Sequence, residues 1–233
     1  MLARTCLKEG TGTPLVFLHG FLGTASDWKA VADRLPFHCI GFDLPGHGKS
    51  PFRQSLTPDF CSALAAQKLP RLHLIGYSMG GRLALQFASS HPQRIASLTL
   101  ISTHPGLDTE EEKRQRLLRD QTLAQEIRTL AIDEFLKRWY DQPLFKTLNA
   151  KMDIRRLRKN QNREGLAQAL NAFSLGRQDK FPLPSLCLAG EHDPAYHRFA
   201  NAIIPDAGHA AHLENPNAVA ERIYEQISLD QVG

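Results

Sequence analysis

The sequence predicts an α/β protein: a mostly parallel β-sheet flanked by helices, in a single domain that spans residues 1–233. Short apolar runs of strand length recur along the chain, and each ends in Gly, Asp, Ser or Thr. Stretches with the apolar spacing of helices alternate with these runs. At 42% hydrophobic content the chain can bury one sizeable core, which makes one domain the simplest expectation.

The expected strands occupy residues 14–20, 38–46, 72–78, 97–103 and 185–193, and helices are expected at residues 28–35 and 82–92. The alternation stops between residues 104 and 181. This segment contains a dense charge run and helical spacing of apolar residues at Leu123, Ile127 and Leu130. We therefore expect a helical cap insertion, residues 104–181, between two parts of a core, residues 1–103 and 182–233. In such a sheet the functional residues lie at the carboxyl ends of the strands.

Composition excludes several classes of function. The 28 Lys and Arg against 24 Asp and Glu are too mild an excess for a nucleic-acid-binding protein. Neither a spanning apolar segment nor an export signal is visible, so we expect a soluble, cytoplasmic protein without membrane contacts, and a monomer. Cys6, Cys39, Cys61 and Cys187 lack CxxC spacing. They are expected to be buried thiols, without a disulfide or a metal site.

The segment "GYSMG", residues 76–80, has the G-x-S-x-G pattern between a predicted strand and a predicted helix. In that context the serine of a nucleophile elbow occupies a strained turn, and the flanking glycines let strand and helix pass closely. The turn exposes the Ser78 hydroxyl near the helix N-terminus, whose free amides favour negative charge. Glycine-rich turns between a strand and a helix can also serve packing alone. The motif therefore indicates catalysis only if a base and an acid for Ser78 occur elsewhere in the chain.

A serine nucleophile or base needs an imidazole and a carboxylate that orients it. Asp193 in "LAGEHDP" and His209 in "DAGHAAHLENP" both follow predicted strands or short apolar runs. The chain order Ser78, Asp193, His209 is that of the α/β-hydrolase triad. His212 is a rival base that begins the following helix. Glu191 and Asp43 are rival acids, of which Asp43 is better explained as a turn residue.

The turn in "LHGFLG", residues 18–23, completes the predicted constellation. An amide from the turn after an early strand and the amide after the nucleophile form the oxyanion hole of this architecture, which nominates the N–H groups of Phe21 and Met79. His19 is expected to be a buried, hydrogen-bonded turn residue. His47, in "DLPGHGKS", is assigned no chemistry.

The motifs "LHGFLG", "DLPGHGKS", "GYSMGGR", "GEHD" and "AGHAAHLENP" resemble the α/β-hydrolase superfamily across nearly the whole chain. "STHPGLDTEEEKRQR", "RDQTLAQEI", "FLKRWYDQPLF" and "GLAQALNAFSLGRQ" resemble more specifically the 2-succinyl-6-hydroxy-2,4-cyclohexadiene-1-carboxylate synthases of menaquinone biosynthesis. This resemblance implies an α/β-hydrolase fold and a lyase that eliminates pyruvate from a cyclohexene with three carboxylates, without a metal or an organic cofactor.

A tricarboxylate substrate calls for several arginines, because a guanidinium binds a carboxylate through two hydrogen bonds. Arg82, one helical turn after Ser78 in an apolar run, is expected to project beside the nucleophile. Arg116 lies seven residues before Leu123 and shares its inward face if the helix is continuous. Arg114 and Arg119 are less favoured, and a solvated helix face is the alternative for all three.

The resemblance assigns a third arginine to Arg158 in "IRRLRKN", with Arg155, Arg156 and Lys159 as alternatives. It also places Trp139 over the pocket, against a role in packing alone. Tyr77, beside the nucleophile, can offer its hydroxyl to the substrate.

The sequence thus favours a lyase that acts through Ser78, His209 and Asp193. A carboxylesterase or C–C hydrolase for a small acidic substrate is the alternative among enzymes, since it needs the same triad. A non-catalytic binding protein on this fold is the alternative from another class.

Overall fold

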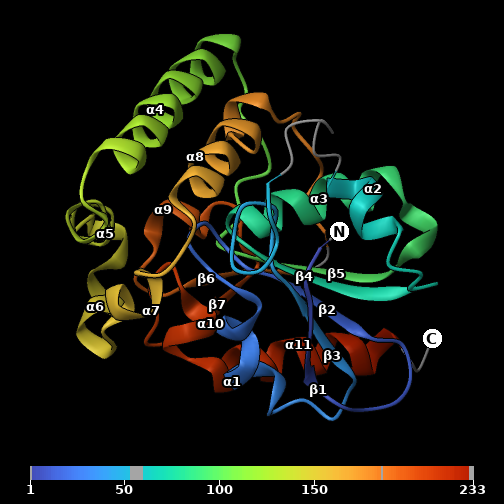
Figure 1. Ribbon diagram of the computed structural model, residues 1–233. Coiled ribbons are helices and arrows are strands. Elements are labelled where there is room, and N and C mark those ends of the chain that lie inside the picture. The colour runs from blue at the N-terminus through green and yellow to red at the C-terminus, as the bar shows by residue number, and fades with distance from the viewer. Residues whose placement is uncertain (1, 53–59, 185, 231–233) are drawn as a thin grey trace.

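The computed structural model describes residues 2–52, 60–184 and 186–230 (Figure 1). Among these residues one sheet of seven strands forms, in the order β1-β3-β2-β4-β5-β6-β7. Only β1 runs antiparallel to its neighbour β3, and the other pairs are parallel. The strands are β1 (Arg4–Lys8), β2 (Leu15–Leu18), β3 (Cys39–Phe42), β4 (Leu72–Tyr77), β5 (Ile95–Ile101), β6 (Leu186–Gly190) and β7 (Ala202–Ile204). The protein has the α/β-hydrolase fold predicted from its sequence.

The central strands are buried on both faces. Every residue of β2, β3 and β4 is buried, as expected where helices cover both faces of a parallel sheet. The five predicted strands correspond to β2 through β6. The sequence interpretation missed β1 and β7, the two edge strands, because β1 is mostly exposed and β7 is only three residues long.

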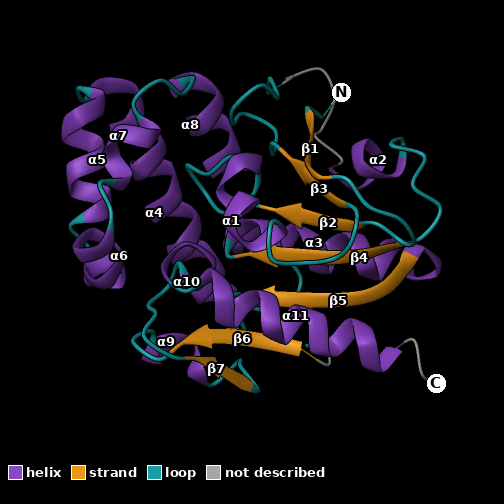
Figure 2. Ribbon diagram, turned by 90° about the horizontal axis from the view of Figure 1, so that it is seen from below, coloured by secondary structure: helices purple, strands orange, loops and turns teal. Residues whose placement is uncertain are grey.

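Helices cover the sheet on both faces (Figure 2). One face carries α1 (Lys29–Ala32) and α11 (Pro216–Asp230), which contact each other, and α1 continues directly from the 3₁₀ helix η1 (Ala25–Trp28). The other face carries α2 (Phe60–Ala65) and α3 (Met79–Ser90), with α3 packed on β4 and β5. The remaining short elements outside the cap are η2 (Pro92–Arg94), α9 (Pro194–His197) and α10 (Ala211–Glu214).

Residues 104–181, between β5 and β6, form helices and no strand. They comprise α4 (Glu110–Thr129), α5 (Ile132–Tyr140), η3 (Pro143–Phe145), α6 (Lys146–Lys151), α7 (Ile154–Arg158), α8 (Arg163–Ala172) and η4 (Leu175–Arg177). Figure 2 shows α4 to α8 together beyond the carboxyl ends of the parallel strands. We call residues 104–181 the cap, and it stands over the end of the sheet where function was expected.

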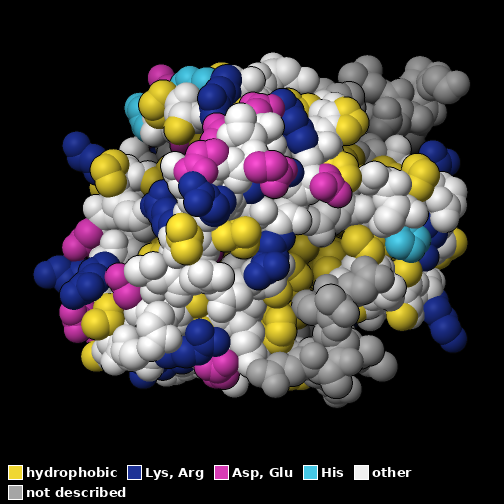
Figure 3. Space-filling model, turned by 90° about the horizontal axis from the view of Figure 1, so that it is seen from above, with side chains coloured by type: hydrophobic (Ala, Val, Ile, Leu, Met, Phe, Trp, Pro, Cys, Tyr) yellow, Lys and Arg dark blue, Asp and Glu magenta, His cyan; other side chains and the backbone are white. Residues whose placement is uncertain are grey.

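The longest cap helix, α4, is held by local polar interactions as well as by packing. The Thr109 hydroxyl accepts from the Glu112 N–H while the Glu112 carboxylate accepts from the Thr109 N–H, a capping box that starts the helix. Lys113 pairs with Glu110, and Arg114 with Glu111. Figure 3 shows basic and acidic side chains interspersed on this side of the molecule. The outer surface of the cap therefore offers no extended field of one sign.

The cysteine prediction is partly wrong. Cys39 and Cys187 are buried, but Cys6 is exposed on β1 and Cys61 is partly exposed on α2. Both lie on elements near the edge of the fold, where burial is incomplete. In the part of the chain that the structure describes, no helix is both long and apolar enough to cross a bilayer.

Candidate active site

Ser78 occupies a sharp turn between β4 and α3. Its φ of 50° lies in the left-handed region, which non-glycine residues adopt only under constraint. The neighbouring glycines supply the constraint, since a Cβ at Gly80 would lie 2.4 Å from the carbonyl oxygens of Leu18 and His19. Strand β2 and helix α3 therefore approach more closely than side chains allow. The strained turn presents the Ser78 hydroxyl at the carboxyl end of the sheet.

The structure brings Ser78, His209 and Asp193 together from three distant parts of the chain. His209 Nε2 lies 3.3 Å from Ser78 Oγ, and His209 Nδ1–H donates to Asp193 Oδ2 at 2.8 Å. Asp193 follows β6, and His209 follows β7, so both side chains emerge at the same end of the sheet as Ser78. His209 and Asp193 are almost completely buried. A hydroxyl, an imidazole and a carboxylate thus form a continuous hydrogen-bonded chain.

The rival residues have other contacts. Asp43 accepts from the N–H groups of Ala25 and Lys49, the turn role that the sequence suggested. Glu191 accepts from the N–H of Asp206 at the surface. His212 is fully buried, and burial lowers its pKa to about 3.

The aromatic rings beside His212 explain its burial. The ring centroids of Trp28 and Tyr77 each lie 4.4 Å from the His212 centroid. His19 is likewise buried: its Nε2 accepts from the Leu44 N–H, and its Nδ1–H donates to the Gly20 carbonyl. It is a turn residue, as predicted.

The two residues nominated for the oxyanion hole lie in the turn after β2 and directly after Ser78. Phe21 belongs to the turn after β2 and lines the same cavity as Ser78. Met79 is the first residue of α3, where a backbone N–H has no acceptor within the helix. The oxyanion hole formed by their two N–H groups stays a prediction.

Ser78 and His209 open onto a cavity of about 190 Å³ between the sheet and the cap. Tyr77 and Trp139 line it, as expected from the sequence. Burial raises the pKa of Tyr77 well above its usual value, so its hydroxyl is protonated. The Trp139 ring contacts the Phe21 ring, with centroids 5.1 Å apart.

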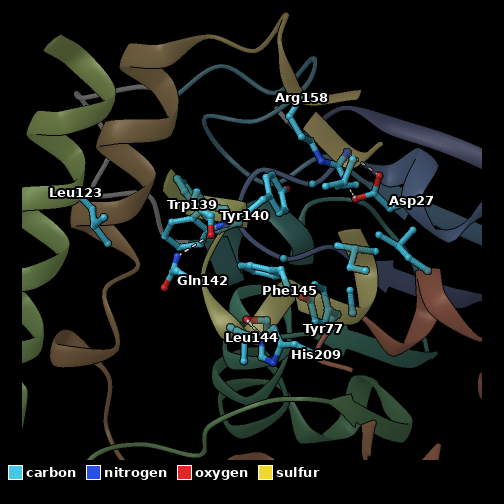
Figure 4. A pocket seen from close by; sticks show the side chains of 18 of the residues that line it. Asp27, Tyr77, Leu123, Trp139, Tyr140, Gln142, Leu144, Phe145, Arg158 and His209 are labelled. Carbon is cyan, nitrogen blue, oxygen red and sulfur yellow. Dashed lines mark hydrogen bonds and ion pairs between the residues drawn. The ribbon is translucent and has the colours of Figure 1, made fainter. Parts of the chain in front are cut away.

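Sequence reasoning missed three further aromatic residues of this cavity: Tyr140, Phe145 and Tyr196. Phe145 and Tyr196 contact the His209 ring, with centroids 6.0 and 4.8 Å away. Tyr140 and Phe145 come from the cap and Tyr196 from the short helix α9. Figure 4 shows Phe145 between Tyr140 and the pair Tyr77 and His209. Tyr140 and Phe145 lie in the segment "FLKRWYDQPLF" that carries the resemblance, but nothing in the local sequence shows that these three side chains face the cavity.

Arg158 lines the cavity and forms a buried ion pair with Asp27 (Figure 4). Its Nη1 and Nη2 donate to the two carboxylate oxygens at 2.9 and 2.8 Å. Burial by itself lowers the pKa of Arg158, but the Asp27 charge and the Tyr140 hydroxyl outweigh it and raise the pKa above its usual value. The alternatives point elsewhere: Arg155 and Arg156 are exposed, and Lys159 pairs with Asp133.

Arg116 also lines the cavity, because α4 is continuous and turns this residue to the same side as Leu123. Its Nε donates to both carboxylate oxygens of the buried Asp120, at 2.9 Å each. Arg119, which the sequence interpretation favoured less, lines the cavity too. Arg114 points outward and pairs with Glu111.

The prediction that Arg82 projects beside the nucleophile is wrong. It is buried, but its Nη1 donates to the Phe173 carbonyl at 2.6 Å and to Gln178 Oε1 at 3.5 Å, and it does not line the cavity. Phe173 is the C-cap of α8, whose carbonyl has no partner within the helix and attracts a cation. Burial, and next the charge of Arg116, lower the pKa of Arg82 to about 10. Arg82 thus joins α3 to the cap.

Among the described residues, one group could offer three ligands to a metal ion: Cys6, Glu9 and His38. It lies at the β1 edge of the sheet, where Cys6 Sγ is 3.1 Å from Glu9 Oε1. Sequence reasoning sought CxxC spacing and missed this group, whose members the β1–β3 pairing brings together.

Comparison with known proteins places this geometry in a family. A family model described as alpha/beta hydrolase fold matches residues 13–151. The chain belongs to this family. A curated relative from Klebsiella pneumoniae, named 2-succinyl-6-hydroxy-2,4-cyclohexadiene-1-carboxylate synthase, is 35% identical over 88% of this chain and 90% of its own length.

Two solved α/β-hydrolase structures are similar over almost the whole chain. MenH from S. aureus is 28% identical with a TM-score of 0.86, over 99% of this chain and 98% of its own. An esterase from Thermogutta terrifontis is 26% identical with a TM-score of 0.72, over 98% and 93%. The α/β-hydrolase core is thus common to a synthase group and to esterases, and the cavity must distinguish between these activities.

Proposed function

We propose that this α/β-hydrolase is a lyase of menaquinone biosynthesis. It converts 2-succinyl-5-enolpyruvyl-6-hydroxy-3-cyclohexene-1-carboxylate to 2-succinyl-6-hydroxy-2,4-cyclohexadiene-1-carboxylate and pyruvate. One observation carries the proposal: the cavity in front of Ser78 and His209 is lined by Arg116, Arg119 and Arg158 against only two aspartates. Arg116 and Arg158 are paired with the two aspartates, so the lining keeps a surplus positive charge, which favours a substrate with several carboxylates over a simple ester. The name of the curated relative supports the same substrate.

The hydrogen-bonded chain suits the elimination of pyruvate. His209 takes the proton of Ser78 Oγ, and the resulting alkoxide removes the proton from the ring carbon next to the succinyl ketone. Asp193 keeps the His209 Nδ1–H oriented and stabilises the imidazolium. The electron pair moves onto the ketone oxygen, giving an enolate that the Phe21 and Met79 amides stabilise.

Collapse of the enolate completes the reaction. The carbonyl re-forms, the electrons shift through the neighbouring ring double bond, and the bond to the enolpyruvyl oxygen breaks. Pyruvate leaves as its enolate, and His209 returns the proton through Ser78. The product ring contains two conjugated double bonds, one more than the substrate ring. No covalent enzyme intermediate is needed. The serine acts here as a base, which explains how a hydrolase triad can serve a lyase.

The cap contributes the groups that distinguish this substrate. Arg116 and Arg158 place guanidinium groups in the cavity wall, each beside an aspartate partner, and Trp139 with Phe145 covers the ring. Tyr77 supplies a neutral hydroxyl next to the base. A cavity closed by aromatic side chains also limits water, which would otherwise compete for the alkoxide.

A carboxylesterase or C–C hydrolase for a small acidic substrate is the second candidate, since a similar structure occurs in an esterase and the same triad can serve ester hydrolysis. In that case Ser78 attacks a carbonyl carbon and forms an acyl-enzyme. The arginines of the cavity would then bind the acidic part of the ester.

One experiment separates the two. Pyruvate release from the enolpyruvyl substrate is measured beside hydrolysis of p-nitrophenyl acetate, for the wild type, Ser78→Ala and Arg116→Gln. Arg114→Gln is the matched control, because Arg114 lies on the same helix but points outward. The lyase proposal expects rapid pyruvate release that Ser78→Ala abolishes and Arg116→Gln reduces. Rapid ester hydrolysis without pyruvate would sink it.

A further inference from the structure

A second cavity adjoins the one that contains Ser78. It has a volume of about 200 Å³ and lies between α4 and α5. Four residues line both cavities: Arg119, Leu123, Trp139 and Gln142. Figure 4 shows Leu123 reaching from α4, with Trp139 and Gln142 on the side of the site that faces this helix. We call this second space the outer cavity, and the four shared residues place it directly beside the site.

The size of the inner cavity requires such an extension. Sites for small organic molecules usually measure roughly 300–1,000 Å³. At about 190 Å³ the inner cavity falls below this range, whereas the two cavities together reach it. A substrate with a six-membered ring, a succinyl arm and an enolpyruvyl arm needs more room than the inner cavity offers, and the outer cavity is the adjoining space.

Arg119 stands out among the arginines around the two cavities. Each of the others already has a partner that compensates its charge or accepts its hydrogen bonds: Arg158 has Asp27, Arg116 has Asp120, Arg138 has Glu134, and Arg82 has the Phe173 carbonyl. Arg119 is exposed, and it has no hydrogen bond or ion pair within the described parts of the chain. Its guanidinium is thus free to bind a carboxylate without first breaking an ion pair.

The other charges of the outer cavity favour the same position. Glu126 lines the outer cavity but not the inner one, so its negative charge repels a substrate carboxylate from that part of the outer cavity. Arg119 lines both cavities, and its positive charge attracts the carboxylate to the side next to the inner cavity. Trp139, which also lines both cavities, offers an apolar surface for the methylene groups of an arm.

We propose that the outer cavity is a subsite for one carboxylate-bearing arm of the substrate, with Arg119 as the residue that binds the carboxylate. The subsite rests on the proposed function, because it needs a substrate with more than one anionic arm. It assigns to Arg119 a role in specificity and leaves proton transfer to Ser78 and His209.

The test measures binding without turnover. In a Ser78→Ala background, the enolpyruvyl cyclohexene tricarboxylate is titrated, and the fluorescence of Trp139 reports occupancy. Hydrogen bonds to charged groups are stronger than those between neutral groups, and the exposure of Arg119 reduces their effect on binding. We expect Arg119→Gln to raise Kd about 5- to 30-fold and Arg119→Lys to raise it about 2- to 5-fold. The control Arg114→Gln should change Kd less than about 2-fold.

The trimethyl ester of the same compound is the second probe, since it keeps the shape and removes the charges. The subsite predicts that Arg119→Gln weakens the tricarboxylate much more than the ester. An equal loss of affinity for both compounds would show that Arg119 acts by packing. An unchanged Kd for the tricarboxylate would refute the subsite, and pyruvate release by the wild type would show that the lyase proposal still holds. If instead the wild type releases no pyruvate and prefers the ester, the proposed function fails together with the subsite.

Discussion

The buried ion pair between Asp27 and Arg158 makes a strong prediction about stability. Asp27→Asn removes the carboxylate that accepts both Nη donors, while the guanidinium stays buried, with only 4% of the side chain exposed. Arg158 Nε already lacks a partner within the described residues. Leaving a buried charge uncompensated costs about 3–5 kcal/mol. For a chain of this length, each kcal/mol moves Tm by roughly 2–4 °C, so we expect Tm to fall by roughly 6–20 °C.

A double variant separates the ion pair from simple packing. Asp27→Asn with Arg158→Met removes both charges and keeps most of the volume, so it should be about 2 kcal/mol more stable than Asp27→Asn alone. The assay is urea unfolding at pH 7, followed by tryptophan fluorescence and circular dichroism. A loss below about 1 kcal/mol for Asp27→Asn, the usual value for exposed pairs, would refute the reasoning. So would a double variant whose loss equals the sum of the two single losses.

Three further predictions follow from the site and its support. Asp193→Asn should lower kcat for pyruvate release by about 10³–10⁴ with an unchanged Tm, and a loss under tenfold would remove Asp193 from the proposed mechanism. Burial lowers the pKa of His19, His47 and His212 from 6.5 to about 3, so they are neutral in the folded protein while the unfolded chain binds protons below pH 6.5. The free energy of unfolding should therefore be steady above pH 7 and fall by up to about 4 kcal/mol per pH unit as the pH drops from 6.5 toward 3. Urea unfolding at pH 7.5, 5.5 and 4.5 measures this change. A free energy of unfolding that does not vary between these pH values would contradict the prediction. Gly80→Ala places a methyl group 2.4 Å from two carbonyl oxygens and should destabilise by about 1–3 kcal/mol in urea unfolding, whereas full stability would show that the turn can relax.

The sequence predicted correctly those strands whose apolar pattern is contained in a short stretch of the chain. Apolar runs marked β2 through β6, because a strand buried on both faces needs side chains of one kind along its whole length. β1 failed this criterion, since an edge strand with one exposed face carries a mixed pattern. The spacing placed Arg116 on the inner side of the cap on the condition that its helix is continuous, and α4 runs without a break from Glu110 to Thr129.

The arginines show where local reasoning ends. Arg82 was expected beside the nucleophile because it lies one helical turn after Ser78. A carbonyl 91 residues away along the chain, at the end of α8, accepts its hydrogen bond instead. Arg158 and Asp27 are separated by 131 residues, and nothing in either local sequence announces their pairing. A guanidinium takes the partner that the folded chain brings within reach.

By itself, the sequence determined the fold class, the strained turn at Ser78 and the chain order of Ser78, Asp193 and His209. These features depend on backbone conformation and on strand ends, which short patterns of glycine and apolar residues encode. Only the tertiary structure decided which arginines face the cavity and which of them are already paired. Within the described residues, it also showed that Arg119, which lines both cavities, has no ion pair. Charge pairing and cavity shape depend on distances between segments remote in sequence, and those distances exist only after the cap has packed on the sheet.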